Sequence, residues 1–140
     1  VWVADIFAYF AGRAFGLRFT KGKLAPSISP GKSWEGVWGG LAGVIVMAFV
    51  WVAADAHWQA VVPSFYSRMA QQGWWLLVIA ALFMVAMSVS GDLVESLIKR
   101  SAGVKDSSGL LPGHGGVLDR VDALLPTLPL AMMLTSLTTL

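Results

Sequence analysis

Cysteine is absent from this 140-residue sequence, and histidine is nearly so. Without cysteine the chain can form neither a disulfide nor a thiolate metal site. Its two histidines, His57 and His114, are too few for a histidine-rich zinc site. A metal bound by this chain must therefore be a hard cation, held by carboxylates and other oxygen atoms.

Charged residues are also scarce. They make up 13% of the chain, against about 25% in an ordinary soluble domain. Hydrophobic residues account for 56%, and the mean hydropathy is +0.69, which places the chain in the membrane class. The net charge of +2 is too small to indicate nucleic acid, and no basic and aromatic residues alternate in the way that nucleic-acid binding needs. The expected partner is the lipid bilayer.

Long apolar segments are what the chain does have. Nineteen residues without a charge, 36–54, reach about 28 Å as a helix, close to the roughly 30 Å of a hydrocarbon core. We predict an all-α, polytopic membrane helix bundle. Its expected spans are residues 1–16 (truncated at the start), 36–54, 74–98 and 118–140, the last of them kinked near Pro126 and Pro129. Because Val1 begins in mid-apolar sequence without a leader, residues 1–140 are expected to be the C-terminal, catalytic membrane portion of a longer chain.

The connectors between these segments differ in charge. Nine of the ten Lys and Arg residues lie in 13–32 or 99–120, and only Arg68 lies in the connector 55–73. The positive-inside rule places the first and third connectors in the cytoplasm, so the two basic loops share one side. We therefore expect an active site at the cytoplasmic face, and the compact loops favour a bacterial inner membrane. His57, in the middle connector, is expected to be a surface residue.

Local patterns predict three details of the first half of the chain. Asp5, Tyr9 and Gly12 are spaced by four and three residues, so they share one helix face. Asp5 must then face protein or water, unless it only marks an interfacial helix end. The segment 17–36 is interpreted as a basic loop, with a helix starting near Ser33. Glycines after that start have the spacing of closely packed membrane helices.

Charge is concentrated between residues 88 and 122, which hold five of the eight acidic residues. Asp92, Glu95, Ser96 and Lys99 lie on one polar helix face, and Asp119 and Asp122 follow one turn apart. Convergent carboxylates repel one another unless a cation lies among them. We therefore predict that Asp92, Asp119 and Asp122 hold Mg²⁺, which takes few carboxylates and fills its remaining positions with water and phosphate oxygens.

Basic residues and glycines surround these carboxylates. The basic residues expected to contact phosphate are Lys99, Arg100, Lys105 and Arg120. Gly113, Gly115 and Gly116 let backbone amides approach an anion. Such a set favours phosphoryl or nucleotidyl transfer. The alternatives are that the charges pair as interfacial salt bridges while the glycines only form turns, and that His114 braces the loop instead of touching phosphate.

The run SLIKRSAGVKDSSGLLPGHGGVLDRVD, residues 96–122, resembles the signature of the phosphatidate cytidylyltransferase (CDP-diacylglycerol synthase) family. The shared features are Ser96, Lys99-Arg100, Lys105-Asp106, Pro112, His114-Gly115-Gly116, Asp119-Arg120 and Asp122. The earlier runs ADIFAYFAGRAFG and KLAPSISPGKSWEG are also similar to the family. The resemblance covers nearly the whole chain, as the C-terminal half of the family's protein.

This resemblance implies that phosphatidate attacks the α-phosphorus of CTP, giving CDP-diacylglycerol and pyrophosphate. It implies Mg²⁺ with K⁺ as a second cation, and a homodimer is among the expected partners. The implied catalytic residues are Asp92, Lys99, Arg100, Asp119 and Asp122, with the three aspartates as metal ligands. The implied substrate contacts are Lys32, Ser33, Lys105, Asp106, His114, Gly115, Gly116 and Arg120.

Three other functions are weighed against this one. A CDP-alcohol phosphatidyltransferase also binds metal through membrane aspartates, but the run expected upstream of the Asp119 and Asp122 pair is missing. A transporter or a non-catalytic assembly subunit would need polar residues deep in several spans, whereas 36–54 carries no charge. A third possibility is a folded but inactive piece that needs substrate contacts from elsewhere.

Overall fold

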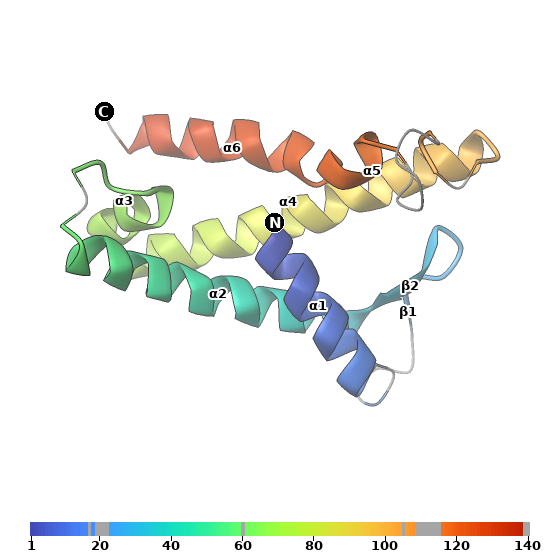
Figure 1. The fold of residues 1–140 in the computed structure, drawn as a ribbon, viewed down its shortest axis with the longest axis horizontal. Coiled ribbons are helices and arrows are strands. Elements are labelled where there is room, and N and C mark those ends of the chain that lie inside the picture. The colour runs from blue at the N-terminus through green and yellow to red at the C-terminus, as the bar shows by residue number, and fades with distance from the viewer. Residues whose placement is uncertain (17, 19–22, 60, 105, 109–115, 139–140) are drawn as a thin grey trace.

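The computed structural model describes every residue except 17, 19–22, 60, 105, 109–115 and 139–140. It is mainly helical, as expected (Figure 1). The elements in chain order are α1 (Trp2–Phe15), β1 (Lys23–Ala25), β2 (Ser29–Ser33), α2 (Trp34–His57), α3 (Phe65–Gln72), α4 (Trp74–Ser101), α5 (Leu118–Val121) and α6 (Leu124–Leu137). The small sheet is a departure from the predicted all-α class.

Helices α2 and α4 are long and apolar enough to cross a membrane. They contain the segments predicted at 36–54 and 74–98 and extend them. The 28 residues of α4 reach about 42 Å, more than the roughly 30 Å of a hydrocarbon core. The last turns of α4 can therefore leave the apolar layer, and these turns carry Asp92, Glu95 and Lys99.

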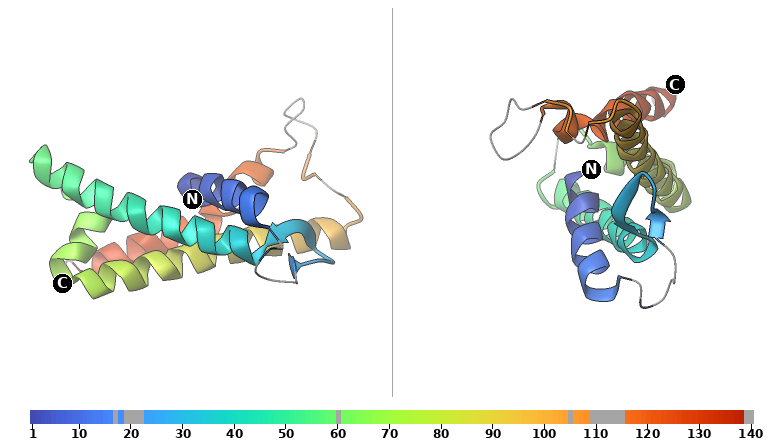
Figure 2. Two further views of the ribbon diagram at one scale, coloured as in Figure 1. Left: turned by 90° about the horizontal axis from the view of Figure 1, so that it is seen from below. Right: turned by 90° about the vertical axis from the view of Figure 1, so that its right-hand side faces the viewer.

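Helix α1 crosses α2 obliquely and packs closely against it (Figures 1 and 2). Glycines of α2 make this contact possible. A Cβ atom built on Gly39 would lie 2.1 Å from the Cβ of Ala11, and one on Gly40 would lie 2.9 Å from the carbonyl oxygen of Ala4. The small-residue packing predicted for this segment is thereby confirmed, and it fixes the position of α1.

Replacing Gly39 with Leu is expected to destabilise the protein, because the new side chain would collide with Ala11. Overpacking of this kind typically costs about 1–3 kcal/mol. The melting temperature of the detergent-solubilised protein, followed by circular dichroism, measures the effect. Gly31→Leu is the matched control, since a Cβ atom at Gly31 meets nothing within 4 Å. Equal losses for the two variants would contradict close packing at Gly39.

The interior consists of two small apolar clusters along α2 and α4. One contains Ala4, Val44, Ala81 and Val85, and the other contains Ala48, Met69, Leu77 and Ala80. Met69 belongs to α3, which lies in the segment predicted to be only a polar connector. The missed signal is Ser64, whose side chain caps α3 by accepting a hydrogen bond from the Ser67 amide. His57 is exposed, as predicted.

The segment predicted as a single span at 118–140 is broken into α5 and α6. The break falls at Asp122 and Ala123, one turn before Pro126. Proline has no N–H to donate to the carbonyl four residues earlier, and its ring crowds that carbonyl, which here belongs to Asp122. The predicted kink near Pro126 thus falls in the turn before that residue, whereas Pro129 lies inside α6. The 14 residues of α6 reach about 21 Å, less than a hydrocarbon core.

The segment interpreted as a basic loop contains an antiparallel hairpin. Lys23 pairs with Ser33, and Ala25 pairs with Ser29. Ser33 ends β2 and caps α2 by accepting a hydrogen bond from the Gly36 amide at 3.2 Å, which confirms the predicted helix start. A two-stranded ribbon tolerates Pro30 because its outer edges need no ladder partner.

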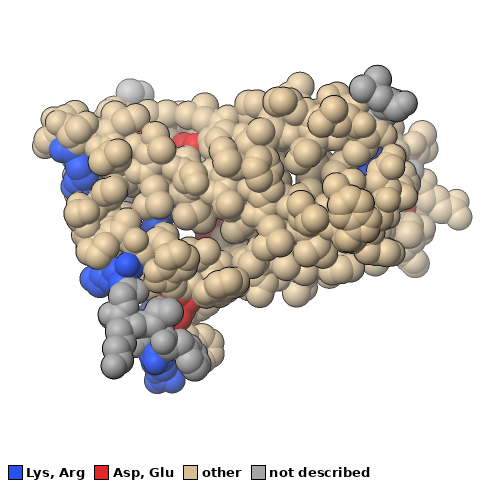
Figure 3. Space-filling view, turned by 180° about the vertical axis from the view of Figure 1, so that it is seen from behind, with Lys and Arg blue, Asp and Glu red and all other residues tan. Residues whose placement is uncertain are grey.

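The hairpin and the C-terminal end of α4 lie at the same end of the molecule (Figure 1). Lysine and arginine gather at this end on the face that Figure 3 shows. Lys32 of β2 forms an ion pair with Asp92 of α4, and the Arg100 Nε donates to the Ile28 carbonyl at 3.5 Å. The expectation that the two basic connectors share one side of the bundle is therefore confirmed.

Candidate functional site

Three carboxylates meet where α4 passes the junction of α5 and α6. Asp92, Glu95 and Asp122 each offer an oxygen atom, and these atoms lie within 4.8 Å of one another. Hard cations bind oxygen ligands at about 2.0–2.6 Å, so ligands on opposite sides of one ion are about 4–5 Å apart. The spacing of the three carboxylates therefore suits a single hard cation. We call Asp92, Glu95 and Asp122 the carboxylate group.

Helix spacing and one glycine assemble this group. Asp92 and Glu95 are three residues apart on α4 and so share a face. Asp122 arrives from the other side at the end of α5. A Cβ atom on Gly91 would lie 3.0 Å from the Asp122 carbonyl oxygen and 2.7 Å from the Cγ of Pro126. Only glycine allows the two segments to approach so closely, and this approach places Asp122 beside Asp92.

Asp119 lies next to the carboxylate group but is bonded elsewhere. Lys99 Nζ donates to Asp119 at 2.6 Å and forms an ion pair with Glu95 at 2.9 Å. The Gly116 amide donates to Asp119 at 2.7 Å, and the Ser107 amide donates at 3.0 Å. Asp119 is in α5, outside the two membrane-length helices. The Lys99 hydrogen bond, followed by those from Gly116 and Ser107, holds the pKa of Asp119 well below its usual range.

Asp119 therefore fastens two loop positions, Ser107 and Gly116, to the end of α4 through Lys99. Replacing it with alanine removes the acceptor of both backbone amides. We expect peptides that contain Ser107 or Gly116 to exchange amide hydrogen with deuterium at least about tenfold faster, because each amide loses its partner. Asp106→Ala is the control, since Asp106 is exposed. Unchanged exchange in Asp119→Ala would show that these bonds do not order the loop.

The formal charges near the carboxylate group sum to a negative value that a divalent cation would neutralise. Asp92, Glu95, Asp119 and Asp122 contribute four negative charges, and Lys32 and Lys99 contribute two positive ones. The remaining formal charge is −2. The Oε1 atom of Glu95 is buried and has no hydrogen-bond partner among the described residues. A buried carboxylate oxygen without a partner is costly, and a bound cation would satisfy it.

The structure distributes the other predicted residues as follows. Arg100 contacts the hairpin through Ile28, Asp106 is exposed, and Ser33 caps α2. The Gly116 amide, expected to face an anion, donates to Asp119. Lys105, His114, Gly115 and the side chain of Arg120 lie outside the described residues, so their predicted roles stay predictions.

The sequence prediction of metal ligands named Asp92, Asp119 and Asp122. The structure brings Asp92 and Asp122 together with Glu95, and Asp119 lies beside them, with Lys99 bonded to both Glu95 and Asp119. The sequence predicts that Glu95 lies on the polar face of its helix, without naming it as a ligand. Its spacing of three from Asp92 was the signal that could have identified it. Ser107, which binds Asp119 together with Lys99 and Gly116, carries no comparable signal in the sequence.

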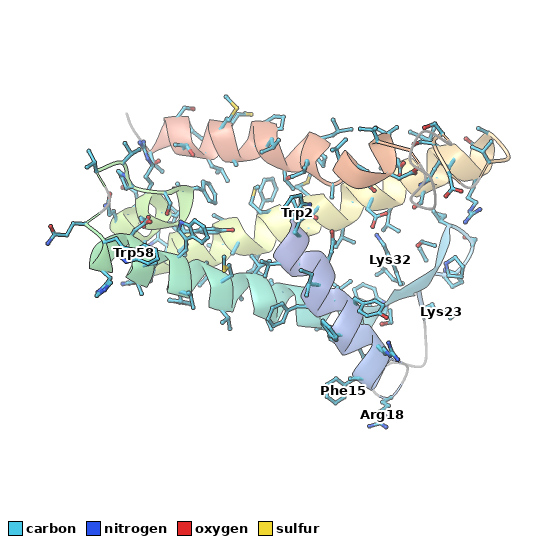
Figure 4. All side chains as sticks on the ribbon, viewed as in Figure 1. Trp2, Phe15, Arg18, Lys23, Lys32 and Trp58 are labelled. Atoms are coloured by element: carbon cyan, nitrogen blue, oxygen red, sulfur yellow. The ribbon has the colours of Figure 1, made fainter. Side chains whose placement is uncertain are left out.

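A cavity of about 410 Å³ adjoins the carboxylate group, between α1, β2, α2 and α4. Asp92 belongs both to the cavity wall and to the carboxylate group. Asp5, Tyr9 and Gly12 also line it, which confirms that they share a helix face. Figure 4 shows Lys32 on the side of the hairpin that faces α4, where it forms its ion pair with Asp92.

Comparison with known proteins shows which family this chain resembles. The model of the cytidylyltransferase family matches residues 1–138. The phosphatidate cytidylyltransferase of Haemophilus influenzae is 50% identical over 92% of this chain and 40% of its own length. That of Pseudomonas aeruginosa is 47% identical over 92% of this chain and 42% of its own. That of Bacillus subtilis is 39% identical over 98% of this chain and 45% of its own length. The chain thus spans less than half the length of these relatives.

Proposed function

The chain belongs to the cytidylyltransferase family, and from this membership and the site we propose that it transfers the cytidylyl group of CTP to phosphatidate. The products are CDP-diacylglycerol and pyrophosphate. The observation that carries the proposal is the carboxylate group, which lies beside two lysines at the polar end of a membrane-length helix. A lipid substrate and a water-soluble nucleotide can both reach such a place.

In the proposed reaction an oxygen of the phosphatidate phosphate forms a bond to the α-phosphorus of CTP. The bond from that phosphorus to the bridging oxygen of pyrophosphate breaks, and pyrophosphate leaves with the electron pair. The phosphate oxygen is already anionic, so no side chain has to remove a proton. The work of the protein is to orient two anions and to offset their charge, for which Lys32 and Lys99 are placed next to the carboxylate group.

Mg²⁺ is the cation that we propose for the carboxylate group, with Asp92, Glu95 and Asp122 as the residues that would hold it. When bound, it would supply positive charge to phosphate oxygens. Asp119 lies beside this set, since Lys99 is bonded to both Asp119 and Glu95. K⁺ is proposed as a second cation on the family resemblance alone.

Orientation and assembly are part of the same proposal. The basic hairpin and the C-terminal end of α4 lie at one end of the molecule, and the positive-inside rule places such an end in the cytoplasm. We therefore propose a cytoplasmic active site. The bacterial relatives support an inner membrane as the location. A homodimer is proposed from the resemblance only.

The full-length protein in liposomes tests this function. With CTP labelled at the α-phosphate, phosphatidate, Mg²⁺ and K⁺, label is expected in the lipid phase. CTP labelled at the γ-phosphate should put its label in pyrophosphate and none in lipid, and diacylglycerol should not replace phosphatidate. A folded protein that transfers no α-label to lipid would overturn the proposal and favour an ion-conducting or scaffolding role.

A further inference from the structure

Lys99 lies between two carboxylates of the site, and its position depends on both. Its Nζ atom is 2.6 Å from Oδ1 of Asp119 and 2.9 Å from Oε2 of Glu95. A lysine side chain is a flexible stem with a compact ammonium group, so it keeps one position only where its partners are themselves fixed. Glu95 is on α4 together with Lys99, whereas Asp119 comes from α5. What fixes Asp119 therefore also fixes Lys99 relative to the carboxylate group.

The two oxygen atoms of Asp119 face different partners. Oδ1 accepts from Lys99, and Oδ2 accepts from the described residues Ser107 and Gly116. Ser107 donates to Oδ2 twice, from its hydroxyl at 2.9 Å and from its amide at 3.0 Å, and this amide also lies 3.3 Å from Oδ1. Rotation of the carboxylate away from this orientation would break bonds on both oxygens. The donors on Oδ2 thus keep Oδ1 directed at Lys99.

The Ser107 hydroxyl occupies space that Gly116 leaves free. A Cβ atom built on Gly116 would lie 1.9 Å from the Ser107 Oγ, so a side chain at position 116 would collide with the hydroxyl. From this place the hydroxyl donates to a charged acceptor, and such hydrogen bonds are shorter and stronger than those between neutral groups. The contact between Ser107 and Asp119 is therefore both directed and confined by its surroundings.

Resting on the proposed function, we infer that Ser107 is a positioning residue for cytidylyl transfer. It orients Asp119, and through Asp119 it places Lys99, which offsets negative charge beside the carboxylate group. Ser107 itself needs to touch neither substrate. An ammonium group that has lost its fixed place still attracts a bound anion over a distance, but it no longer meets the charge that shifts onto the leaving pyrophosphate. The effect of Ser107 therefore falls on kcat and not on KM.

Ser107→Ala removes the hydroxyl and keeps the backbone amide. For the full-length protein in liposomes, we expect kcat for transfer from α-labelled CTP to fall about tenfold, with KM for CTP and for phosphatidate within about twofold of the wild type. Ser107→Thr keeps a hydroxyl and should restore most of kcat. Ser101→Ala is the matched control, because the Ser101 hydroxyl donates to the Ile98 carbonyl of its own helix at 2.8 Å. Equal melting temperatures establish that each variant is folded.

The reactivity of the Lys99 amine reports its position without any turnover. The full-length protein in detergent is treated with a water-soluble acetylating reagent, and peptide mass spectrometry follows the fraction of Lys99 that is modified over time. In Ser107→Ala, Lys99 is expected to react at least about threefold faster than in the wild type, because an amine that leaves its partners more often meets the reagent more often. Ser107→Thr and Ser101→Ala should match the wild type. The exposed Lys23 is the internal reference.

The two measurements separate this inference from the proposed function. An unchanged rate of Lys99 acetylation in Ser107→Ala would overturn the inference, and so would a fall in kcat of equal size in Ser101→Ala. If the wild type transfers no label to lipid but Lys99 still reacts faster in Ser107→Ala, the placement of Lys99 by Ser107 stands and the proposed function is lost. If the wild type transfers label and kcat is unchanged in Ser107→Ala, the function stands and the positioning role is lost.

Discussion

Replacing Asp122 with Asn is expected to reduce cytidylyl transfer at least about 10³-fold while the protein stays folded. The substitution keeps the size of the side chain and removes one of the three charges of the carboxylate group. A catalytic group that offsets transition-state charge typically contributes about 10²–10³ in kcat, and loss of a metal ligand acts on every such contact at once. Lipid-phase label from α-labelled CTP measures the loss.

Asp55→Asn is the matched control for this substitution. Asp55 is in the last turns of α2 and accepts a hydrogen bond from the Ser64 amide at 3.0 Å, which an asparagine oxygen can still accept. A second readout needs no turnover. Millimolar Mg²⁺ should raise the melting temperature of the wild type and of Asp55→Asn, but not that of Asp122→Asn. Full transfer activity in Asp122→Asn would exclude Asp122 as a ligand.

Glu95→Gln distinguishes the structure's ligand set from the one predicted from sequence. If Glu95 holds the cation, its loss should weaken the Mg²⁺ response at least about tenfold, in the range seen when groups around a metal are removed. Asp119→Asn should have a smaller effect on the Mg²⁺-induced rise in melting temperature. It should have a larger effect on amide hydrogen exchange in the peptides that contain Ser107 and Gly116. The opposite ranking would show that Asp119 leaves Lys99 and binds the metal in its place.

A second large effect is expected at Gly91, which carries no charge. Gly91→Val would push Asp122 and Pro126 away from α4, because a Cβ atom there already lies 3.0 Å or less from atoms of both. Displacement of catalytic groups by about 1 Å can cost about 10²-fold in rate, so we expect a loss of that order. The Mg²⁺-induced rise in melting temperature should shrink in parallel.

Ala86→Val is the control for added bulk. It lies on the same helix at an exposed position, where a larger apolar side chain meets lipid or solvent. Transfer activity and the Mg²⁺ response should match the wild type. If Gly91→Val retained both, the close approach of α4 to the α5–α6 junction would not be what assembles the carboxylate group.

Local spacing in the sequence was sufficient to predict much of this site. The 3.6-residue period of a helix places Asp92, Glu95 and Lys99 on one face, and the Lys99–Glu95 ion pair confirms it. The same period places Asp5, Tyr9 and Gly12 together on the cavity wall. Hydropathy alone located α2 and α4, because a hydrocarbon core requires a minimum apolar length.

Other features depended on contacts between segments that are distant in sequence. The β1–β2 hairpin has little apolar content to signal it, and its Lys32 is tied to Asp92 of α4. Helix α3 is only eight residues long, and packing of Met69 against α2 and α4 stabilises it. Helices this short are marginal alone, so the Ser64 cap is a weak local signal and α3 depends on its tertiary packing.

The sequence by itself determined that the chain is an apolar helical protein of this family, with its acids and bases gathered at one end. The tertiary structure decided which carboxylates meet. Asp119 and Asp122 are one helical turn apart, so the sequence alone does not distinguish them as ligands. The proline-induced break and the close approach at Gly91 place Asp122 beside Asp92 and Glu95. Lys99 bridges Asp119 to Glu95, and two loop amides also donate to Asp119. Helical periodicity sets which residues share a face, whereas packing sets which faces meet.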